Sequence, residues 1–216
     1  MHIDNRKELL YRTAFKMFLT RHFESVTISD IENATGMTRG AITYYAKNKM
    51  GLFKAVVKHY IIDKQNINYK FDPNQPTFKD FIDAYLNGVR CTMSGMQRLI
   101  DELDAKNASR SYLFLLLQIR MYFPDLHDEY LTNRNREMGI WTVKISEAIQ
   151  RGELKPDIDI IECAEQYVYL FYGQALYDSL LSGLDVERLR RGMYNSYKLM
   201  KTQETPNPMN PLISQS

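Results

Sequence analysis

One stretch of the chain decides the fold: residues 27–57 read TISDIENATGMTRGAITYYAKNKMGLFKAVV. It begins with Thr27 followed three residues later by Asp30, the capping-box pattern of a helix N-terminus. Gly36 predicts the end of that helix after about two turns, because glycine readily takes the left-handed conformation just past a helix. Thr38 can then cap a second short helix. The stretch therefore predicts two short helices joined by a tight turn.

Apolar residues recur at helical spacing along the whole N-terminal part, and they predict a buried face for each helix. A helix over about 5–21 precedes the stretch, and another amphipathic helix follows Asn48 and reaches about residue 66. The inward positions are Leu10, Ala14, Met17 and Phe18, then Ile28, Ile31 and Ala34, then Ala41, Ile42 and Tyr45, and finally Leu52, Phe53, Val56, Val57, Tyr60 and Ile61. Helices of seven or eight residues are unstable alone, so the short pair must pack on its neighbours as a helix-turn-helix.

The second short helix is expected to present a polar outer face. Its members combine a forked donor, a position without a side chain, a hydroxyl with a methyl, a phenol and a cation: Arg39, Gly40, Thr43, Tyr44 and Lys47. Such a face suits a helix that enters the major groove of DNA. The spacing also fits a generic helical hairpin with a solvated polar face, so this alternative stays open.

The charge distribution is uneven although the net charge is only +2. Residues 1–60 hold ten of the 28 Lys and Arg and five of the 26 Asp and Glu, which leaves 18 bases and 21 acids for the rest. A basic head on a mildly acidic body is what a nucleic-acid binder needs, because contacts to phosphates supply most of the non-specific affinity. Many enzymes show a similar asymmetry, so charge alone decides little.

The remainder of the chain is helical in pattern, and the fold class is expected to be all-α. Helices are predicted over 77–93, 95–106, 109–122, 126–151, 158–182 and 186–201. We expect a helix-turn-helix domain of three helices over 1–64, a larger helical domain over 65–202 and a disordered tail over 203–216. Pro73 and Pro76 cannot continue a helix, and the first boundary is placed slightly before them, within the helix that ends near residue 66.

Several other classes of protein find no support. Cys91 and Cys163 lie far apart, and the four histidines form no pair at ligand spacing, so neither a disulfide framework nor a metal site is expected. The chain has no Glu-x-x-His, glycine-rich phosphate loop or nucleophile elbow, so we expect neither an enzyme nor a cofactor. The longest apolar run, 167–172, is too short to span a bilayer. No secretory signal is evident, and a cytoplasmic protein without a membrane partner is expected.

Residues 27–57 closely resemble the DNA-binding domain of the TetR family of bacterial regulators. The match extends over about the first 60 residues, with Ala14, Phe18 and the turn at Phe23 in the expected places. Beyond them the resemblance is limited to the helical plan and the turn at 152–157. The resemblance implies a regulator of transcription, commonly a repressor, that a small-molecule effector releases from its operator. The alternative is a helical ligand-binding or interaction protein that does not touch DNA.

The resemblance also implies roles for individual residues. Thr27 would meet a phosphate, and Lys49 would anchor another from the start of the following helix. Contacts to the bases or the adjacent backbone would come from Thr38, Arg39 and Thr43. Contacts to phosphates or the groove wall would come from Tyr44 and Tyr45. The chain departs from the family at Thr43, where an aromatic is usual, and at Ala46, where phenylalanine is common.

In this family the last two helices of each chain form a four-helix dimer interface, which here implies a homodimer on a palindromic double-stranded operator. The helix over 158–182 is apolar nearly all round, so it must be buried on several sides. The residues expected at the interface are Val168, Phe171, Ala175, Leu176, Leu180, Leu189, Met193 and Tyr197.

Aromatic and methionine side chains crowd the middle helices. They are Met93, Met96, Tyr112, Met121, Tyr122, Met138, Trp141 and Tyr167. Such residues at helical spacing are more often plain core. The family plan instead implies that they line an effector pocket, and buried Tyr and Trp keep polar atoms that a ligand can satisfy. Few buried charges are expected there, which favours an apolar or aromatic effector over a phosphate or a metal.

Overall fold

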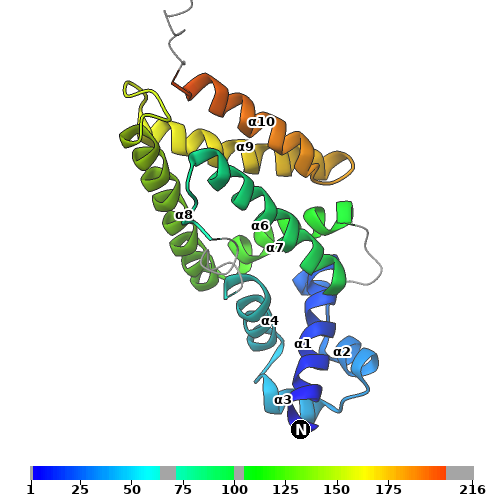
Figure 1. The fold of residues 1–216 in the computed structure, drawn as a ribbon. Helices are drawn as coiled ribbons and strands as arrows, with labels where there is room; N and C mark the ends of the chain where they lie inside the picture. The colour runs from blue at the N-terminus through cyan, green and yellow to red at the C-terminus, as the bar shows by residue number, and fades with distance from the viewer. Residues whose placement is uncertain (1, 64–71, 100–104, 203–216) are drawn as a thin grey trace, which may run out of the picture.

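The computed structural model describes residues 2–63, 72–99 and 105–202, and its regular elements in these ranges are helices (Figure 1). They are α1 (His2–Thr20), the 3-10 turn η1 (Phe23–Ser25), α2 (Ile28–Thr35), α3 (Arg39–Tyr45), α4 (Lys49–Val57), the π-helical turn η2 (Lys58–Ile62), α6 (Phe78–Leu99), α7 (Ala105–Tyr122), α8 (Pro124–Gln150), α9 (Ile160–Leu181) and α10 (Val186–Met200). The only bridge pairing in the described ranges joins Leu154 and Lys201. The expectation of an all-α fold is confirmed.

We call the N-terminal part of the structure, from α1 to η2, the head. Its helices begin and end at the capping residues. Thr27 forms a complete capping box with Asp30 at the start of α2. Gly36 ends that helix in the left-handed conformation with φ 68°. The hydroxyl of Thr38 accepts from the Ala41 N–H at the start of α3. These local hydrogen bonds are why a sequence pattern alone locates both helices of the motif.

Four sequence expectations need correction or fall outside the description. No separate helix covers 95–106, because α6 runs on through Gly95 to Leu99 and buries Met96 against the head, and α7 begins at Ala105. A single glycine costs a helix only about 1 kcal/mol, which such packing offsets. Ala34 was expected to point inward but is exposed. The helix expected to reach residue 66 passes into η2, and its end beyond Asp63 lies outside the described residues, as does the tail over 203–216.

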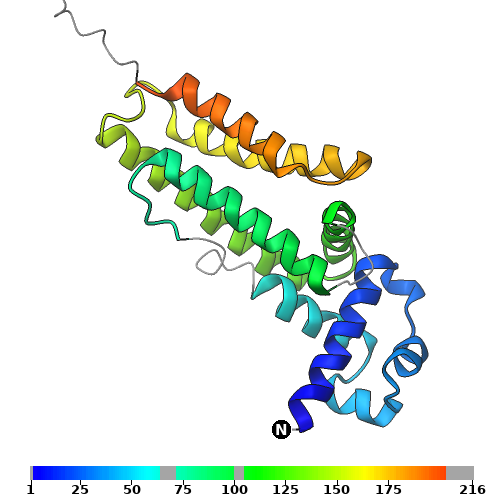
Figure 2. The same cartoon turned by 45° about the vertical axis from the view of Figure 1, so that its right-hand side comes forward.

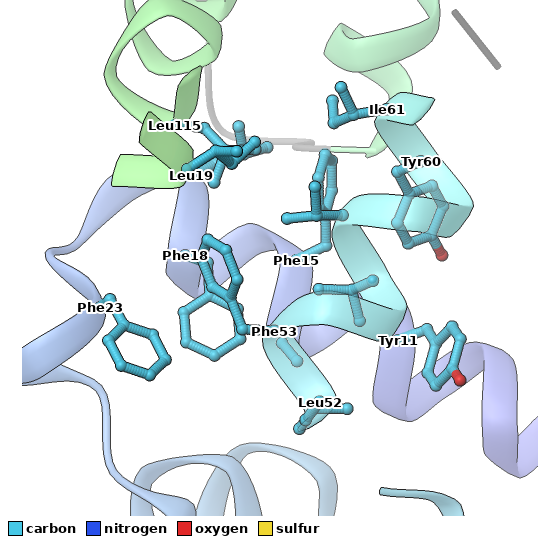
Figure 3. Close-up of a cluster of buried hydrophobic side chains, with 14 of the residues drawn as sticks. Tyr11, Phe15, Phe18, Leu19, Phe23, Leu52, Phe53, Tyr60, Ile61 and Leu115 are labelled. Atoms are coloured by element: carbon cyan, nitrogen blue, oxygen red, sulfur yellow. The ribbon is translucent and has the colours of Figure 1, made fainter. Parts of the chain in front are cut away.

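The described residues form two hydrophobic clusters. The head cluster gathers α1, α2, α3, α4 and η2 with the inward side chains of α7, and Figure 3 shows Leu115 lying above Phe18 and Phe53. The second cluster joins α6, α8, α9 and α10 around Trp141, at the end of the molecule opposite to α3 (Figure 2). The core of the head is therefore completed by α7, which belongs to the second half of the chain.

Polar contacts also tie the head to α7. Gln118 is buried, and its Nε2 donates to the Phe18 carbonyl at 3.1 Å. Its Oε1 accepts from the Phe23 N–H at 2.6 Å. One side chain thus holds both the end of α1 and the turn that leads to α2.

A second set of polar contacts joins the head to the first half of α8. Lys54 of α4 donates to Asp125 at 2.6 Å, and Lys58 of η2 lies 3.1 Å from Glu129. One turn further, Asn133 donates to the Ile62 carbonyl at 3.2 Å. These contacts follow successive turns of α8, so the position of α8 and the orientation of the head are linked.

Candidate nucleic-acid interface

The outer face of α3 is exposed as the sequence predicts. Ile42 is buried in the head cluster and Tyr45 packs against it, while Arg39, Gly40, Thr43 and Lys47 are exposed. Tyr44 is 78% exposed, and its ring meets that of Tyr45 edge-on at 5.1 Å. An aromatic ring that packs so little within its own chain is available to a partner surface.

Two residues of this face have their polar atoms engaged in different ways. The hydroxyl of Thr43 donates to the Arg39 carbonyl at 2.8 Å, so the side chain offers mainly its methyl group outward. The guanidinium of Arg39 is 3.8 Å from Glu32 and mostly exposed, which leaves its forked donors accessible. A methyl group and a guanidinium are groups that read a thymine methyl and a guanine edge in the major groove.

Thr27 lies at the exposed N-terminus of α2, where the expected phosphate contact would occur. Its hydroxyl accepts from the Asp30 N–H at 3.0 Å and donates to the Asp30 carboxylate at 2.9 Å. Hydrogen bonds from the backbone and hydroxyl of Thr27 hold the pKa of Asp30 below its usual value, with Arg21 adding to the effect. A phosphate at this position would have to compete with Asp30 for the hydroxyl hydrogen.

The two lysines that flank Asn48 have different surroundings. Lys47 is exposed and makes no hydrogen bond or ion pair within the described residues. Lys49 is half-buried, and its ammonium donates to the carbonyls of Phe23 at 2.9 Å and Glu24 at 3.4 Å. It also lies 4.3 Å from the centre of the Phe23 ring. Lys49 therefore fixes the η1 turn against the start of α4.

The residues expected to line an effector pocket are not brought together. Met93, Met96, Tyr112 and Tyr122 belong to the head cluster or pack against it. The second cluster contains Trp141 and Tyr167, whose rings stack at 4.7 Å, with Met138 packed against it. Met121 is 66% exposed. The aromatic group around Trp141 is a packed core, so the expectation that these eight residues form one pocket needs correction.

The residues expected at a dimer interface also divide. Five of them, Val168, Ala175, Leu189, Met193 and Tyr197, are buried inside the protomer and so are unavailable to a second chain. Phe171 packs partly against the same core, while Leu176 and Leu180 are exposed. Sequence reasoning missed further exposed apolar residues on the last two helices: Ile161, Tyr169, Tyr177, Leu181 and Leu199. The all-round apolar character of α9 was the signal, but it did not show which side faces the core.

Comparison with known proteins agrees with this geometry. Residues 10–56 match a family model described as bacterial regulatory proteins, tetR family. These residues make the N-terminal part of the chain similar to that family. No curated protein matches the chain in sequence.

Solved structures extend the likeness to TetR-family regulators over most of the chain. A regulator from Agrobacterium tumefaciens aligns with a TM-score of 0.65 and 14% identity, over 92% of this chain and 99% of that one. One from Cytophaga hutchinsonii gives 0.66 and 15% over 93% and 97%. The regulator CifR, as a cysteine mutant complexed with operator DNA, gives 0.60 and 18% over 89% and 95%. At these identities the likeness shows a shared fold.

Two further findings bear on what the chain could bind. In the described ranges, no three His, Cys, Asp or Glu side chains gather where they could hold a metal ion. None of the described helices has the length and apolar character needed to span a membrane.

Proposed function

We propose that this chain is a TetR-family, sequence-specific DNA-binding regulator of transcription, and that it acts as a repressor released by a small-molecule effector. The observation that carries the proposal is the exposed outer face of α3, held in a capped helix-turn-helix within the family-matched residues 10–56. The similar regulator CifR has been solved with operator DNA, which supports DNA as the partner.

The outer face of α3 supplies both kinds of contact that a DNA reader needs. Arg39 would donate to a guanine edge, and the methyl of Thr43 would contact a thymine methyl. Tyr44 and Lys47 would bind phosphates on either side and so set the register of the helix in the groove. Thr38, which caps α3, and Gly40 would let the helix N-terminus approach the backbone closely.

A homodimer would present two such helices to a palindromic operator. The exposed apolar residues of α9, with Leu180 at 74% exposure, would be covered by the same surface of a second chain. Each recognition helix would then meet one half-site, and half-sites about 34–36 Å apart fit helices that enter successive turns of the major groove.

The test is fluorescence anisotropy with DNA fragments that the pure protein selects from genomic DNA, measured against a random duplex over a range of salt. Selected fragments should bind more tightly than random duplex by a factor of about 10³ or more, and both affinities should fall steeply with salt. Absence of binding to either DNA at low salt would favour the alternative, a helical ligand-binding or interaction protein.

A further inference from the structure

A pocket of about 320 Å³ lies between α7, α8 and α9. Most of the surface that faces the pocket is apolar, although some lining residues carry polar groups. The lining residues are Leu113, Leu116, Leu117, Ile119, Arg120, His127, Tyr130, Tyr172 and Leu176. None of these residues was expected to bind an effector. The volume is that of a site for a small molecule, and the apolar wall favours a ligand with a hydrocarbon body.

The helix connections place the polar and apolar lining at opposite ends. Since α7 ends at Tyr122 and α8 begins at Pro124, Arg120 and His127 lie on either side of that turn. Arg110 at the start of α7 donates to the carbonyls of Ser179 and Leu181, so the start of α7 lies against the end of α9. The wall near Leu113 and Leu176 is therefore the apolar end, and the wall near Arg120 is the polar end.

Two tyrosine hydroxyls of the pocket lining form a pair with an unused hydrogen. Tyr130 and Tyr172 are 3.0 Å apart at their hydroxyl oxygens and make no other hydrogen bond within the described residues. One hydroxyl donates to the other, so one hydrogen remains for an acceptor. Behind them, Arg134 lies 4.2 Å from the centre of the Tyr172 ring and pairs with Glu137. This support holds the tyrosines in place.

Arg120 is exposed at the polar end, and within the described residues no hydrogen bond or ion pair is made by its side chain. On the first turns of α8, Asp125 and Glu129 are bound to Lys54 and Lys58. A guanidinium without an ion-pair partner among the described residues, in the same pocket as a spare hydroxyl donor, favours a planar anionic acceptor. We propose that the pocket binds a small apolar monocarboxylate, with its carboxylate at Arg120 and its body along the leucines; as the effector site, this rests on the proposed function.

The same two helices carry the contacts that hold the head. Gln118, which binds the backbone at Phe18 and Phe23, is flanked by the pocket residues Leu117 and Ile119. On α8, the pocket residue His127 lies between Asp125 and Glu129, which bind the head. A ligand that draws α7 and α8 together therefore changes the position of α3. Binding of the acid should then lower the affinity for the operator, and binding of the operator should lower the affinity for the acid.

Calorimetry with two acids and their neutral isosteres tests the site without DNA. Octanoate and 4-phenylbutyrate should bind about tenfold or more tightly than octanamide and 4-phenylbutanamide. Arg120→Ala should reduce the affinity for the acids to that for the amides, whereas Arg120→Lys should keep part of the difference. Arg136→Ala, which removes an exposed arginine of α8 outside the pocket, is the matched control and should change neither. Failure of both acids to bind at millimolar concentration, or equal binding of acid and amide, overturns the proposal.

A second measurement separates this inference from the proposed function. The acid that binds more tightly is titrated with and without a selected operator fragment, and its affinity should fall severalfold when operator is present. If the protein binds the acid in a way that depends on Arg120 but binds no DNA, the carboxylate site is supported and the proposed function as a DNA-binding regulator is refuted. Operator binding without acid binding would refute the site alone. Equal acid affinity with and without operator would overturn the coupling through α7 and α8.

Discussion

Lys47 and Lys49 are two cations two residues apart, and their surroundings predict different effects on mutation. The ammonium of Lys49 satisfies the carbonyls of Phe23 and Glu24 and lies over the Phe23 ring, so Lys49→Met should lower the free energy of unfolding by about 1–3 kcal/mol. Lys47 makes no such contact within the described residues, so Lys47→Met should leave stability unchanged. Urea unfolding followed by circular dichroism measures both.

The same two variants separate structural from phosphate-binding roles. Lys47→Met should flatten the dependence of log affinity on log salt by about one unit, because one phosphate contact is lost. A similar change in slope for Lys49→Met, with unchanged stability, would contradict the structural role and support the phosphate contact that the family resemblance implies.

Arg39 is predicted to read a base rather than to position the protein. Its guanidinium is mostly exposed at the start of α3 and is only 3.8 Å from Glu32, an ion pair that DNA can replace. Arg39→Ala should lower the affinity for a selected fragment by about 1–3 kcal/mol and the affinity for random duplex by much less. Anisotropy titrations with both duplexes decide the matter: an equal loss on the two would show that Arg39 contacts only phosphate.

At the scale of elements, the sequence predicts the helices wherever a local signal marks their ends. Thr27 with Asp30, Gly36 and Thr38 each make the hydrogen bond or adopt the dihedral angle that their pattern predicts. The continuation of α6 through Gly95 depends instead on Met96 packing against the head, a contact distant in sequence. The π-helical turn η2 likewise has no pattern of its own that marks it. Element ends set by tertiary contacts are therefore the ones that a single sequence misplaces.

The salt bridge between Lys54 of α4 and Asp125 of α8 leads to a prediction about pH. The hydrogen bond from Lys54 holds the pKa of Asp125 below its usual value. Because the pKa is lowered in the folded state, the stabilising contribution is present above the unfolded value, near 4, and is lost as pH falls through the lowered one. Carbon-detected NMR titration of Asp125 should give a midpoint below 3.8. Lys54→Met should raise this midpoint to the ordinary value, and an unchanged midpoint would show that Lys54 does not hold Asp125 in solution.

At the scale of the whole molecule, the exposed outer face of α3 could be predicted and the pocket between α7, α8 and α9 could not. The outer face of α3 follows from the periodicity of one helix, so Arg39 and Tyr44 were placed outward correctly. A pocket depends on how three helices distant in sequence leave space between them. Met121 and Trp141 look alike as apolar residues of middle helices, yet one is exposed and the other is fully buried. The pocket beside Arg120 could not be found from composition for the same reason.

Assembly gives the last prediction, because α9 presents one apolar face to the core and another to solvent. Leu180 is 74% exposed, so Leu180→Glu places a charge on the surface of a folded protomer, and circular dichroism should show that the helical fold persists. In a dimer that buries Leu180 the same charge must lose its hydration, so light scattering should detect monomers. Specific DNA affinity should collapse as well, because two half-sites are no longer bound together.

Met193 provides the matched comparison, since it was expected at the interface but is fully buried in the protomer. Met193→Glu should destabilise the fold itself, by several kcal/mol on the scale of an unpaired buried charge. Leu180 is a better probe than Leu176, which also lines the pocket. If Leu180→Glu remains dimeric and binds the selected fragment as tightly as the parent protein, the two chains do not associate through this face of α9. The recognition helices must then be spaced by another surface.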